Sequence, residues 1–559
     1  MSEEIRIGVF VCHCGVNIGG YVDVPDVVDY SMTLPGVVYS EPNLYTCSSD
    51  GLQKIQEAIK KHNLNRVVVA SCTPRTHEPL FQSACEEAGL NKYLFEMANI
   101  RDQCSWVHMH EPNKATQKAK DLVRMAVAKA RLLSPEEEPE IDIQPIGLVI
   151  GGGASGMTAA LSLERQGFEV HLVEKESQLG GTLNDLDSLF PTNKKAEEVI
   201  KPLIDKIADS VKISVYLESE VEKVKGFIGN FDVEIKSKEE IIPLNVGTII
   251  IATGADYLTP TGLYGYGEIE GVITQKELEQ MIKEGKVDAK KIVMIQCVGA
   301  RNEERPYCSR ICCSEAMKNA SMLVDMDPEK DVYILYRDLQ TYGVYYTEME
   351  WNAKKRGVKF IKYEEDRPPV VEQVEKRPVV KIHTPLLGSD LTIKADMVVL
   401  SVPLIPNQDN KKLSQLLKVP LNSDGFFMEA HVKLRPIDFA TDGIYVCGTA
   451  HSPKELPESI AQAKGAASRA GIPMAKGTLK TAAYTSVVDE TKCSGCGTCI
   501  EVCPYNAIIK NERGLAQVTE AVCKGCGVCG ASCPERAITM RHFTDEEIEA
   551  QGIAALKEA

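Results

Sequence analysis

The chain has 559 residues, 19 of them cysteines, and a formal net charge of −16. Its length exceeds what one hydrophobic core usually supports, so three or four domains are expected. The acidic balance argues against nucleic acid and anionic membranes as partners, and no apolar run reaches the roughly 18 residues that a membrane span needs. An acidic N-terminus without a signal peptide predicts a cytoplasmic protein, in which clustered cysteines serve as ligands or redox groups and not as disulfides.

Residues 1–135 are predicted to form an α/β domain with cysteines at the ends of its strands. An apolar strand at 5–11 runs into a C-x-C pair, and a second strand at 66–70 is followed by another cysteine. Such strand ends would bring their thiols to one edge of a sheet, where a C-x-C pair suits ligation better than packing. We therefore predict an iron–sulfur site built from Cys12, Cys14, Cys47 and Cys72, with Cys104 as a reserve ligand. The alternative is a set of small buried thiols, which is the role expected for Cys85.

A dinucleotide-binding βαβ unit occupies residues 146–174, after an acidic linker at 134–140 that is bracketed by prolines. A short apolar strand meets a G-x-G-x-x-G loop, a helix-compatible segment and a second strand that closes on an acid. The glycines permit a tight turn, the approach of a pyrophosphate and close helix–strand packing, while the acid binds ribose hydroxyls. The residues assigned to the cofactor in this unit are Gly151, Gly153, Ala154, Ser155, Gly156, Glu174 and Lys175.

Later stretches complete a flavin-binding pattern. A glycine pair places Gly181 and Thr182 beside the cofactor, and a buried strand ends in Ala252, Thr253 and Gly254. These landmarks resemble the thioredoxin reductases, and the resemblance implies FAD and an α/β fold with two dinucleotide domains for residues 144–480. The matching closing motif contributes Gly448 and Thr449, the second in place of the family's usual acid, which holds the ribityl chain. Flavin binding is expected to survive this departure, with a changed contact at Thr449.

The second dinucleotide domain, expected at about 288–395, departs from the same pattern. Its strands are present at 291–296 and 332–336, but the glycine loop between them is replaced by Cys297, Cys308, Cys312 and Cys313. We predict that NAD(P) does not bind there and that a [4Fe–4S] cluster lies beside the flavin, with the adjacent cysteines opening a helix. A dithiol redox pair is the alternative, although it usually has C-x-x-C spacing. Lys318 is assigned a catalytic role at the flavin N5 edge or toward an anionic flavin, with an exposed helical lysine as the alternative.

Residues 481–541 carry the run C-x2-C-x2-C-x3-C-P twice, roughly 30 residues apart. This is the pattern of bacterial two-cluster ferredoxins, in which the fourth cysteine of each run serves the other cluster. The first cluster is assigned to Cys493, Cys496, Cys499 and Cys533, and the second to Cys523, Cys526, Cys529 and Cys503. Structural zinc is a minor alternative. Residues 542–559 are predicted to form a helical tail that is exposed to solvent or docked on a partner.

The combination resembles the A-subunit family of heterodisulfide reductases over nearly the whole chain. The resemblance rests on C-H-C-G at 12, S-C-T-P-R-T-H-E-P at 71, M-A-N-I-R-D-Q-C-S-W-V-H at 97, the flavin loop, C-x10-C-x3-C-C at 297 and the ferredoxin end. It implies flavin-based electron bifurcation or confurcation inside a larger complex. Electrons from a hydrogenase or formate dehydrogenase-type module would reach FAD through clusters and divide between ferredoxin and a disulfide-reducing subunit.

The resemblance also implies heterodisulfide reductase B/C-type subunits as partners and a homodimer at the core of the complex. The methanogen form has a further ferredoxin unit inside the flavin domain, and no cysteine lies between Cys104 and Cys297, so this chain is a short version. Two enzyme alternatives remain open. One is a flavin and iron–sulfur relay without bifurcation, in a quinone-interacting or ring-reducing complex. The other is a self-contained disulfide or NAD(P)-dependent reductase, against which the missing second glycine loop argues. A scaffold without catalysis is the least expected class.

Overall fold

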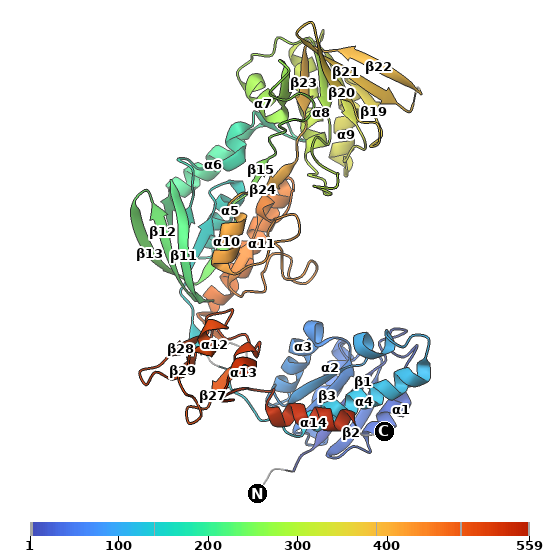
Figure 1. Ribbon diagram of the computed structural model, residues 1–559, viewed down its shortest axis with the longest axis vertical. Coiled ribbons are helices and arrows are strands. Elements are labelled where there is room, and N and C mark those ends of the chain that lie inside the picture. Colours follow the sequence, from blue (N-terminus) through green and yellow to red (C-terminus); the bar gives the residue numbers. More distant parts are fainter. Residues whose placement is uncertain (1–3, 139, 387, 481–482, 557–559) are drawn as a thin grey trace. The chain divides into compact units, whose positions relative to one another are not determined.

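The chain folds into two compact units, one formed by residues 1–140 with 480–559 and the other by residues 141–479 (Figure 1). The computed structural model describes residues 4–138, 140–386, 388–480 and 483–556. The second unit occupies the middle of the sequence. The N-terminal domain and the ferredoxin segment are therefore separated in the sequence by the second unit, although they fold together as one unit.

The N-terminal domain is built on a parallel sheet with strand order β2-β1-β3-β4. Its strands are β1 (Ile7–Cys12), β2 (Val37–Asn43), β3 (Arg66–Ser71) and β4 (Phe95–Asn99). Its helices are α1 (Val24–Ser31), α2 (Ser49–Lys61), α3 (Pro74–Glu87) and α4 (Pro112–Ala130). The two central strands are buried along their whole length, as expected for continuous apolar runs in a parallel sheet. The predicted neighbourhood of β1 and β3 is confirmed, because they pair directly.

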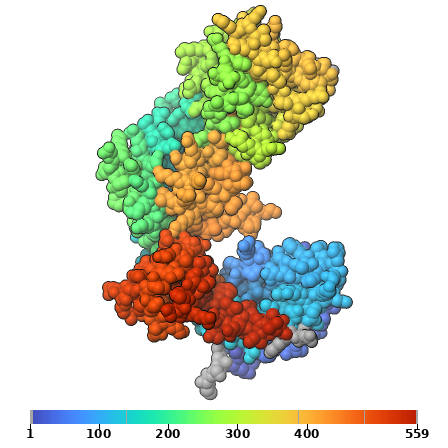
Figure 2. All heavy atoms as spheres, in the orientation of Figure 1, coloured from blue at the N-terminus to red at the C-terminus, as the bar shows by residue number. Residues whose placement is uncertain are grey.

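The ferredoxin segment of the same unit repeats one small motif. Each half pairs two short strands and carries a short helix: β27 (Ser486–Val488) with β30 (Ile538–Met540), β28 (Ile508–Lys510) with β29 (Ala516–Val518), α12 (Thr498–Glu501) and α13 (Val528–Ser532). The tail then forms α14 (Asp545–Ala555), which begins with a Thr544–Glu547 capping box. Most of α14 is exposed, as expected for the tail, but one face of the helix packs on α4 of its own chain (Figure 2).

The flavin-type domain in the second unit has a parallel sheet with order β10-β7-β6-β14-β25. The strands are β6 (Ile146–Ile150), β7 (Glu169–Val173), β10 (Ile213–Tyr216), β14 (Thr248–Ile251) and β25 (Ile444–Val446). Helices α5 (Ala154–Arg165) and α11 (Leu456–Lys476) pack together on one face. On the other face lies an antiparallel sheet of β11 (Ser219–Phe227), β12 (Asn230–Ser237) and β13 (Glu240–Val246).

The second domain of this unit has its own parallel sheet, with order β16-β23-β17-β18-β19. Its strands are β16 (Val272–Thr274), β17 (Lys291–Ile295), β18 (Asp331–Tyr336), β19 (Lys359–Lys362) and β23 (Met397–Leu400). Helices α7 (Gln275–Lys283), α8 (Cys312–Met326) and α9 (Val344–Lys355) cover one face, and an antiparallel sheet of β20 (Val370–Val374), β21 (Arg377–Thr384) and β22 (Ser389–Lys394) covers the other. The sheet extends beyond the predicted limits of 288–395, since β16 and β23 lie outside them. The chain enters and leaves this domain through the paired strands β15 (Ala255–Tyr257) and β24 (Leu404–Pro406).

Candidate functional site

A cavity of about 620 Å³ lies at the carboxyl ends of β6, β7 and β14. This volume is in the range of cofactor sites, and the position is the one at which open α/β sheets bind ligands. Of the residues assigned to the cofactor from the sequence, the lining includes Gly151, Gly153, Ala154, Ser155, Glu174, Lys175, Gly181, Thr182, Ala252, Thr253, Gly254 and Thr449. Gly156 and Gly448 stand outside the lining and have packing roles instead.

Gly156 allows α5 to approach the glycine loop closely. A Cβ atom at Gly156 would stand 1.8 Å from the carbonyl oxygen of Gly151. At Gly448, which has φ of +72°, a Cβ would stand 2.4 Å from Ser155 Oγ, so the closing motif also meets the start of α5. A Cβ on Gly153 would meet nothing closer than 3.9 Å, which leaves the loop open at the helix N-terminus. An open loop with free amides at that point fits a pyrophosphate.

Glu174 is held rigidly at the end of β7. Its side chain is buried, and its carboxylate accepts hydrogen bonds from the backbone N–H of Gly152 at 2.6 Å and of Glu176 at 2.9 Å. A carboxylate has about four acceptor positions, so two backbone bonds leave capacity for ribose hydroxyls. Lys175 forms an ion pair at 3.0 Å with Asp409, which also lines the cavity.

The closing motif follows β25 and places Thr449 in the cavity wall. The Gly448 N–H donates to Gln462 Oε1 at 3.0 Å, which ties the motif to α11. Sequence reasoning missed Lys454, a buried lysine that lines the same wall between the motif and α11. The only sequence signal was a lysine in the turn directly after the motif, and a turn lysine is usually exposed.

The four cysteines that replace the second glycine loop come together at the start of α8. Cys297 lies two residues after the end of β17 and has φ of +60°, and α8 begins at Cys312, as predicted. Burial raises the pKa of the Cys312 thiol, and the nearby Cys313, Cys297 and Cys308 thiolates raise it further. Burial likewise raises the pKa of the Cys297 thiol, which Arg301 and Arg337 oppose by favouring the thiolate. Four thiols with cationic neighbours are a donor set that fits an iron–sulfur cluster.

The first turns of α8 also line the large cavity, through Ile311, Glu315 and Lys318. The cysteine group therefore lies directly beside the predicted flavin site. Burial raises the pKa of Glu315 to about 7, with the Glu279 carboxylate adding to the rise. Sequence reasoning missed both acids, because a helical glutamate carries no sign of burial.

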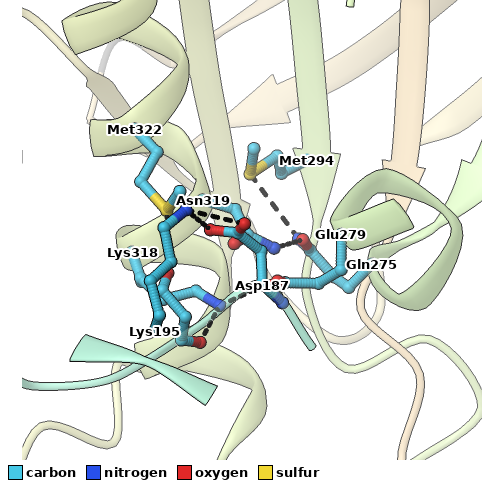
Figure 3. Close-up of polar contacts among 9 residues, drawn as sticks. Asp187, Lys195, Gln275, Glu279, Met294, Lys318, Asn319 and Met322 are labelled. Atoms are coloured by element: carbon cyan, nitrogen blue, oxygen red, sulfur yellow. Dashed lines mark hydrogen bonds and ion pairs between the residues drawn. The ribbon is translucent and has the colours of Figure 1, made fainter. Parts of the chain in front are cut away.

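Lys318 belongs to a buried polar network between the two domains of this unit (Figure 3). It is 2% exposed, so the alternative of an exposed helical lysine is wrong. Its Nζ forms an ion pair with Glu279 of α7 and donates to the carbonyl oxygen of Ser188 at 2.8 Å. Glu279 in turn accepts from the backbone N–H of Asp187 at 3.0 Å. An ammonium has three donors, so one donor remains for a ligand in the cavity.

In the N-terminal domain the structure brings Cys12, Cys14, Cys47 and Cys72 to the carboxyl edge of the sheet. Burial raises the pKa of the Cys47 thiol, and the Cys12 and Cys14 thiolates raise it further. Burial also raises the pKa of Cys72, where Arg101 acts in the opposite direction and the Cys47 and Cys12 thiolates add to the rise. These effects place Cys47 within electrostatic reach of the other three thiols, and four thiols at one sheet edge are a donor set that fits an iron–sulfur cluster.

Cys104 is not part of this group. Its thiol is buried and donates to the carbonyl oxygen of Ala115 on α4 at 3.0 Å. Its pKa is raised by burial, with Lys118 and Asp121 as the charged neighbours, and not by the other thiols. The assignment of Cys104 as a reserve ligand is therefore wrong, because the turn after β4 directs it toward α4. Cys85 is fully buried in α3, in line with a packing role.

In the ferredoxin segment, a small cavity is lined by the four cysteines assigned to the first cluster: Cys493, Cys496, Cys499 and Cys533. The two fourth cysteines are held alike, since Cys503 accepts from Ala507 N–H and Cys533 from Ala537 N–H, both at 3.3 Å. Burial raises the pKa of the Cys529 thiol, and the Cys523 and Cys526 thiolates raise it further. Among the described residues, no three histidine, cysteine, aspartate or glutamate side chains are close enough to hold a single metal ion.

Known proteins similar to this chain include A subunits of heterodisulfide reductases. The A subunit of the H(2):CoB-CoM heterodisulfide,ferredoxin reductase of Methanothermobacter thermautotrophicus is 42% identical over 650 aligned positions, which cover 100% of this chain and 98% of the relative. The chain belongs to the A-subunit family of heterodisulfide reductases. The iron-sulfur A subunit of the CoB--CoM heterodisulfide reductase of Methanocaldococcus jannaschii is 39% identical, with 97% of each chain covered. The family to which the chain belongs is one of oxidoreductases.

Two domain families match parts of the chain. The Pyridine nucleotide-disulphide oxidoreductase family matches residues 147–299, and the 4Fe-4S dicluster domain matches residues 486–540. These matches imply FAD in the first region and [4Fe–4S] clusters in the second. Among solved structures, thioredoxin reductase of T. acidophilum is similar at 21% identity and a TM-score of 0.42, covering 60% of this chain and 99% of that one. None of the helices in the described part of the chain has the length and apolarity to cross a membrane.

Proposed function

We propose that this chain is the FAD and iron–sulfur electron-transfer subunit of a heterodisulfide-reductase-type complex, and that it performs flavin-based electron bifurcation or confurcation. The observation that carries the proposal is the group of four cysteines at the start of α8. The following turn of the same helix lines the cavity. Where a nicotinamide-dependent flavoprotein binds a phosphate, this chain has thiols. Electrons would then reach and leave the flavin through iron–sulfur clusters and not as a hydride from NAD(P)H.

Residues of the chain have separate tasks in this proposal. The open loop at the start of α5 and Glu174 bind the dinucleotide, as Gly153 and the buried carboxylate allow. FAD, when bound, supplies the exchange between two-electron and one-electron chemistry. Glu279 fixes the position of Lys318, which would offer its remaining donor to the N5 edge of the flavin when FAD is bound. Arg301 and Arg337 favour the thiolate form of Cys297 and thereby favour ligation.

The proposed cluster inventory is four [4Fe–4S] groups. Two lie in the ferredoxin domain, one lies at the start of α8, and one lies at the edge of the N-terminal sheet. Cluster potentials span a wide range with charge, hydrogen bonding and exposure, so the direction of electron flow depends on the partners.

The proposed partners follow from the relatives' names, which include hydrogen- and formate-dependent heterodisulfide,ferredoxin reductases. They are a hydrogenase or formate dehydrogenase-type donor module, heterodisulfide reductase B/C-type subunits and ferredoxin, around a homodimer of this chain in the cytoplasm. The alignment with the Methanothermobacter relative spans 650 positions against 559 residues here, which supports the absence of one inserted unit. With one unit fewer, a relay without bifurcation is the second candidate.

An anaerobic redox titration of the purified protein tests the proposal, with iron and FAD measured in the same sample. Four clusters predict about sixteen iron atoms per FAD, whereas about eight would leave only the ferredoxin domain loaded. A flavin that takes up both electrons in a single step supports bifurcation, and two well-separated one-electron steps support the relay. Reduction of the isolated protein by NADH would contradict both.

A further inference from the structure

The wall of the large cavity contains five lysines, one of which differs from the rest. Four are paired with carboxylates: Lys175 with Asp409, Lys276 with Asp185, Lys318 with Glu279, and Lys412 with Glu220. Among the described residues, no carboxylate forms an ion pair with the fifth, Lys454. Lys454 therefore adds a positive charge to the wall that no directly paired carboxylate neutralises.

Lys454 is also well buried, with 8% of its surface exposed. Its Nζ donates to the carbonyl oxygens of Gly448 and Ser452, both at 2.7 Å, and to Ser452 Oγ at 3.1 Å. All three acceptors are neutral, so they fix the ammonium in place without balancing its charge. Burial lowers the pKa of Lys454 to about 8, with Glu458 opposing the fall and Arg310 adding to it. A buried cation without a direct ion-pair partner is costly, and an anion in the cavity would relieve that cost.

The position of Lys454 indicates which part of a dinucleotide it meets. The pyrophosphate is expected at the open start of α5, and the ribose at Glu174. Lys454 instead bonds to the closing motif and directly precedes α11, whose N-terminal residues Leu456 and Ser459 line the cavity. The positive end of this 21-residue helix and the ammonium thus act on the same region. Thr449 stands where related flavoproteins have an acid, so this position of the closing motif adds no carboxylate beside the charge.

We propose that the positive charge of Lys454, whose three donors are held by the protein, lies near the pyrimidine end of the flavin ring and favours the reduced, singly negative form of the cofactor. The inference rests on the proposed function, in which FAD occupies this cavity. Uptake of two electrons from the iron–sulfur groups and one proton from solvent leaves the ring with one negative charge. The Lys454 ammonium stabilises that charge more than it stabilises the neutral oxidised ring, so it raises the two-electron reduction potential.

The test compares the reduction equilibrium of bound FAD in the full-length protein and in four variants. Lys454→Met and Lys454→Gln remove the charge, Lys454→Arg retains it, and Lys464→Met removes an exposed lysine of the same helix α11 as a control. Each holoprotein is titrated anaerobically, and FAD content is measured beside it. We expect K454M and K454Q to lower the equilibrium constant for two-electron reduction at least tenfold, which is about 30 mV. K454R and K464M should stay within twofold of the parent protein.

A parental potential in K454M or K454Q, with FAD bound, would overturn the inference and leave the proposed function intact. An equal fall of the reduction potential in K464M would also overturn the inference, because loss of any positive charge on α11 would then have the same effect. If K454M fails to hold FAD, the comparison of K454Q with K454R decides in the same way. Absence of FAD from the parent protein would instead contradict the proposed function.

Discussion

The buried ion pair between Lys318 and Glu279 makes a quantitative prediction about the seam between the two domains of the flavin-type unit. The two side chains are 1% and 0% exposed, and they also satisfy the Ser188 carbonyl and the Asp187 N–H across the seam. Lys318→Met would leave an uncompensated carboxylate and an unpaired carbonyl in the interior. Removing one partner of such a pair costs about 3–5 kcal/mol. Since 1.4 kcal/mol is a factor of ten, opening of the seam should become roughly a hundredfold to a few thousandfold more frequent.

Hydrogen exchange measures this opening directly. Backbone amides of α7 and α8 should exchange faster in K318M by the same factor, in protein stripped of FAD so that cofactor loss does not contribute. The double variant K318M/E279Q should restore most of the protection, because glutamine can still accept from Asp187 without a charge. Lys290→Met is the matched control, since its exposed pair with Asp327 is screened by solvent and should not matter. Unchanged exchange in K318M would refute the reasoning that this pair holds the seam.

Three further predictions concern the thiols and Lys454. Cys72→Ala and Cys308→Ala should each lower the iron content by about four atoms per FAD, whereas Cys104→Ala should leave the iron content unchanged. Loss of iron in C104A would show that Cys104 is a ligand after all. Ser486→Ala removes a hydroxyl that lies 3.1 Å from Cys529 Sγ and 3.7 Å from Cys523 Sγ. The reduction potential of the second ferredoxin cluster should therefore fall, while that of the first cluster stays constant. EPR-monitored titration separates the two clusters, and equal shifts of both potentials would contradict the ligand assignment. Burial lowers the pKa of Lys454 to about 8, so between pH 8 and 10.5 the unfolded chain binds more protons than the FAD-free folded protein. The free energy of unfolding should therefore rise with pH across that window, by up to roughly 3 kcal/mol more than in K454M. Urea titrations at several pH values measure this difference, and parallel pH curves for the two proteins would show that the lysine is solvated.

Much of this architecture could be predicted from local patterns. The glycine loop at 151–156 and the flanking apolar strands define the first βαβ unit, because few other structures need glycine at those three positions. The repeated cysteine run defines the ferredoxin domain, and the apolar runs before Cys12 and Cys72 predict neighbouring parallel strands. In each case the spacing along the chain determines the geometry over a short distance.

The remaining features depend on contacts between distant segments. Lys318 and Glu279 meet across two helices, and neither residue differs in sequence from an exposed helical charge. Cys104 follows a strand like the other thiols, but the turn after β4 directs it toward Ala115. Lys454 follows the closing motif in a turn, where exposure is the usual outcome. Burial and side-chain direction in these cases are set by packing partners that no local pattern specifies.

The packing of α14 on α4 has a consequence for how the protein is made. Arg124 on α4 donates to the carbonyl oxygen of Ala554 at 2.8 Å, and these residues are 430 positions apart in the chain. At about 5–20 residues per second, the ribosome needs roughly 20–90 s to synthesise the intervening segment. During that interval the N-terminal domain is folded without its covering helix, while the flavin-type unit emerges and folds. The N-terminal thiols can therefore receive iron before the unit that contains them is closed, and completion of the first domain waits until α14 has been synthesised.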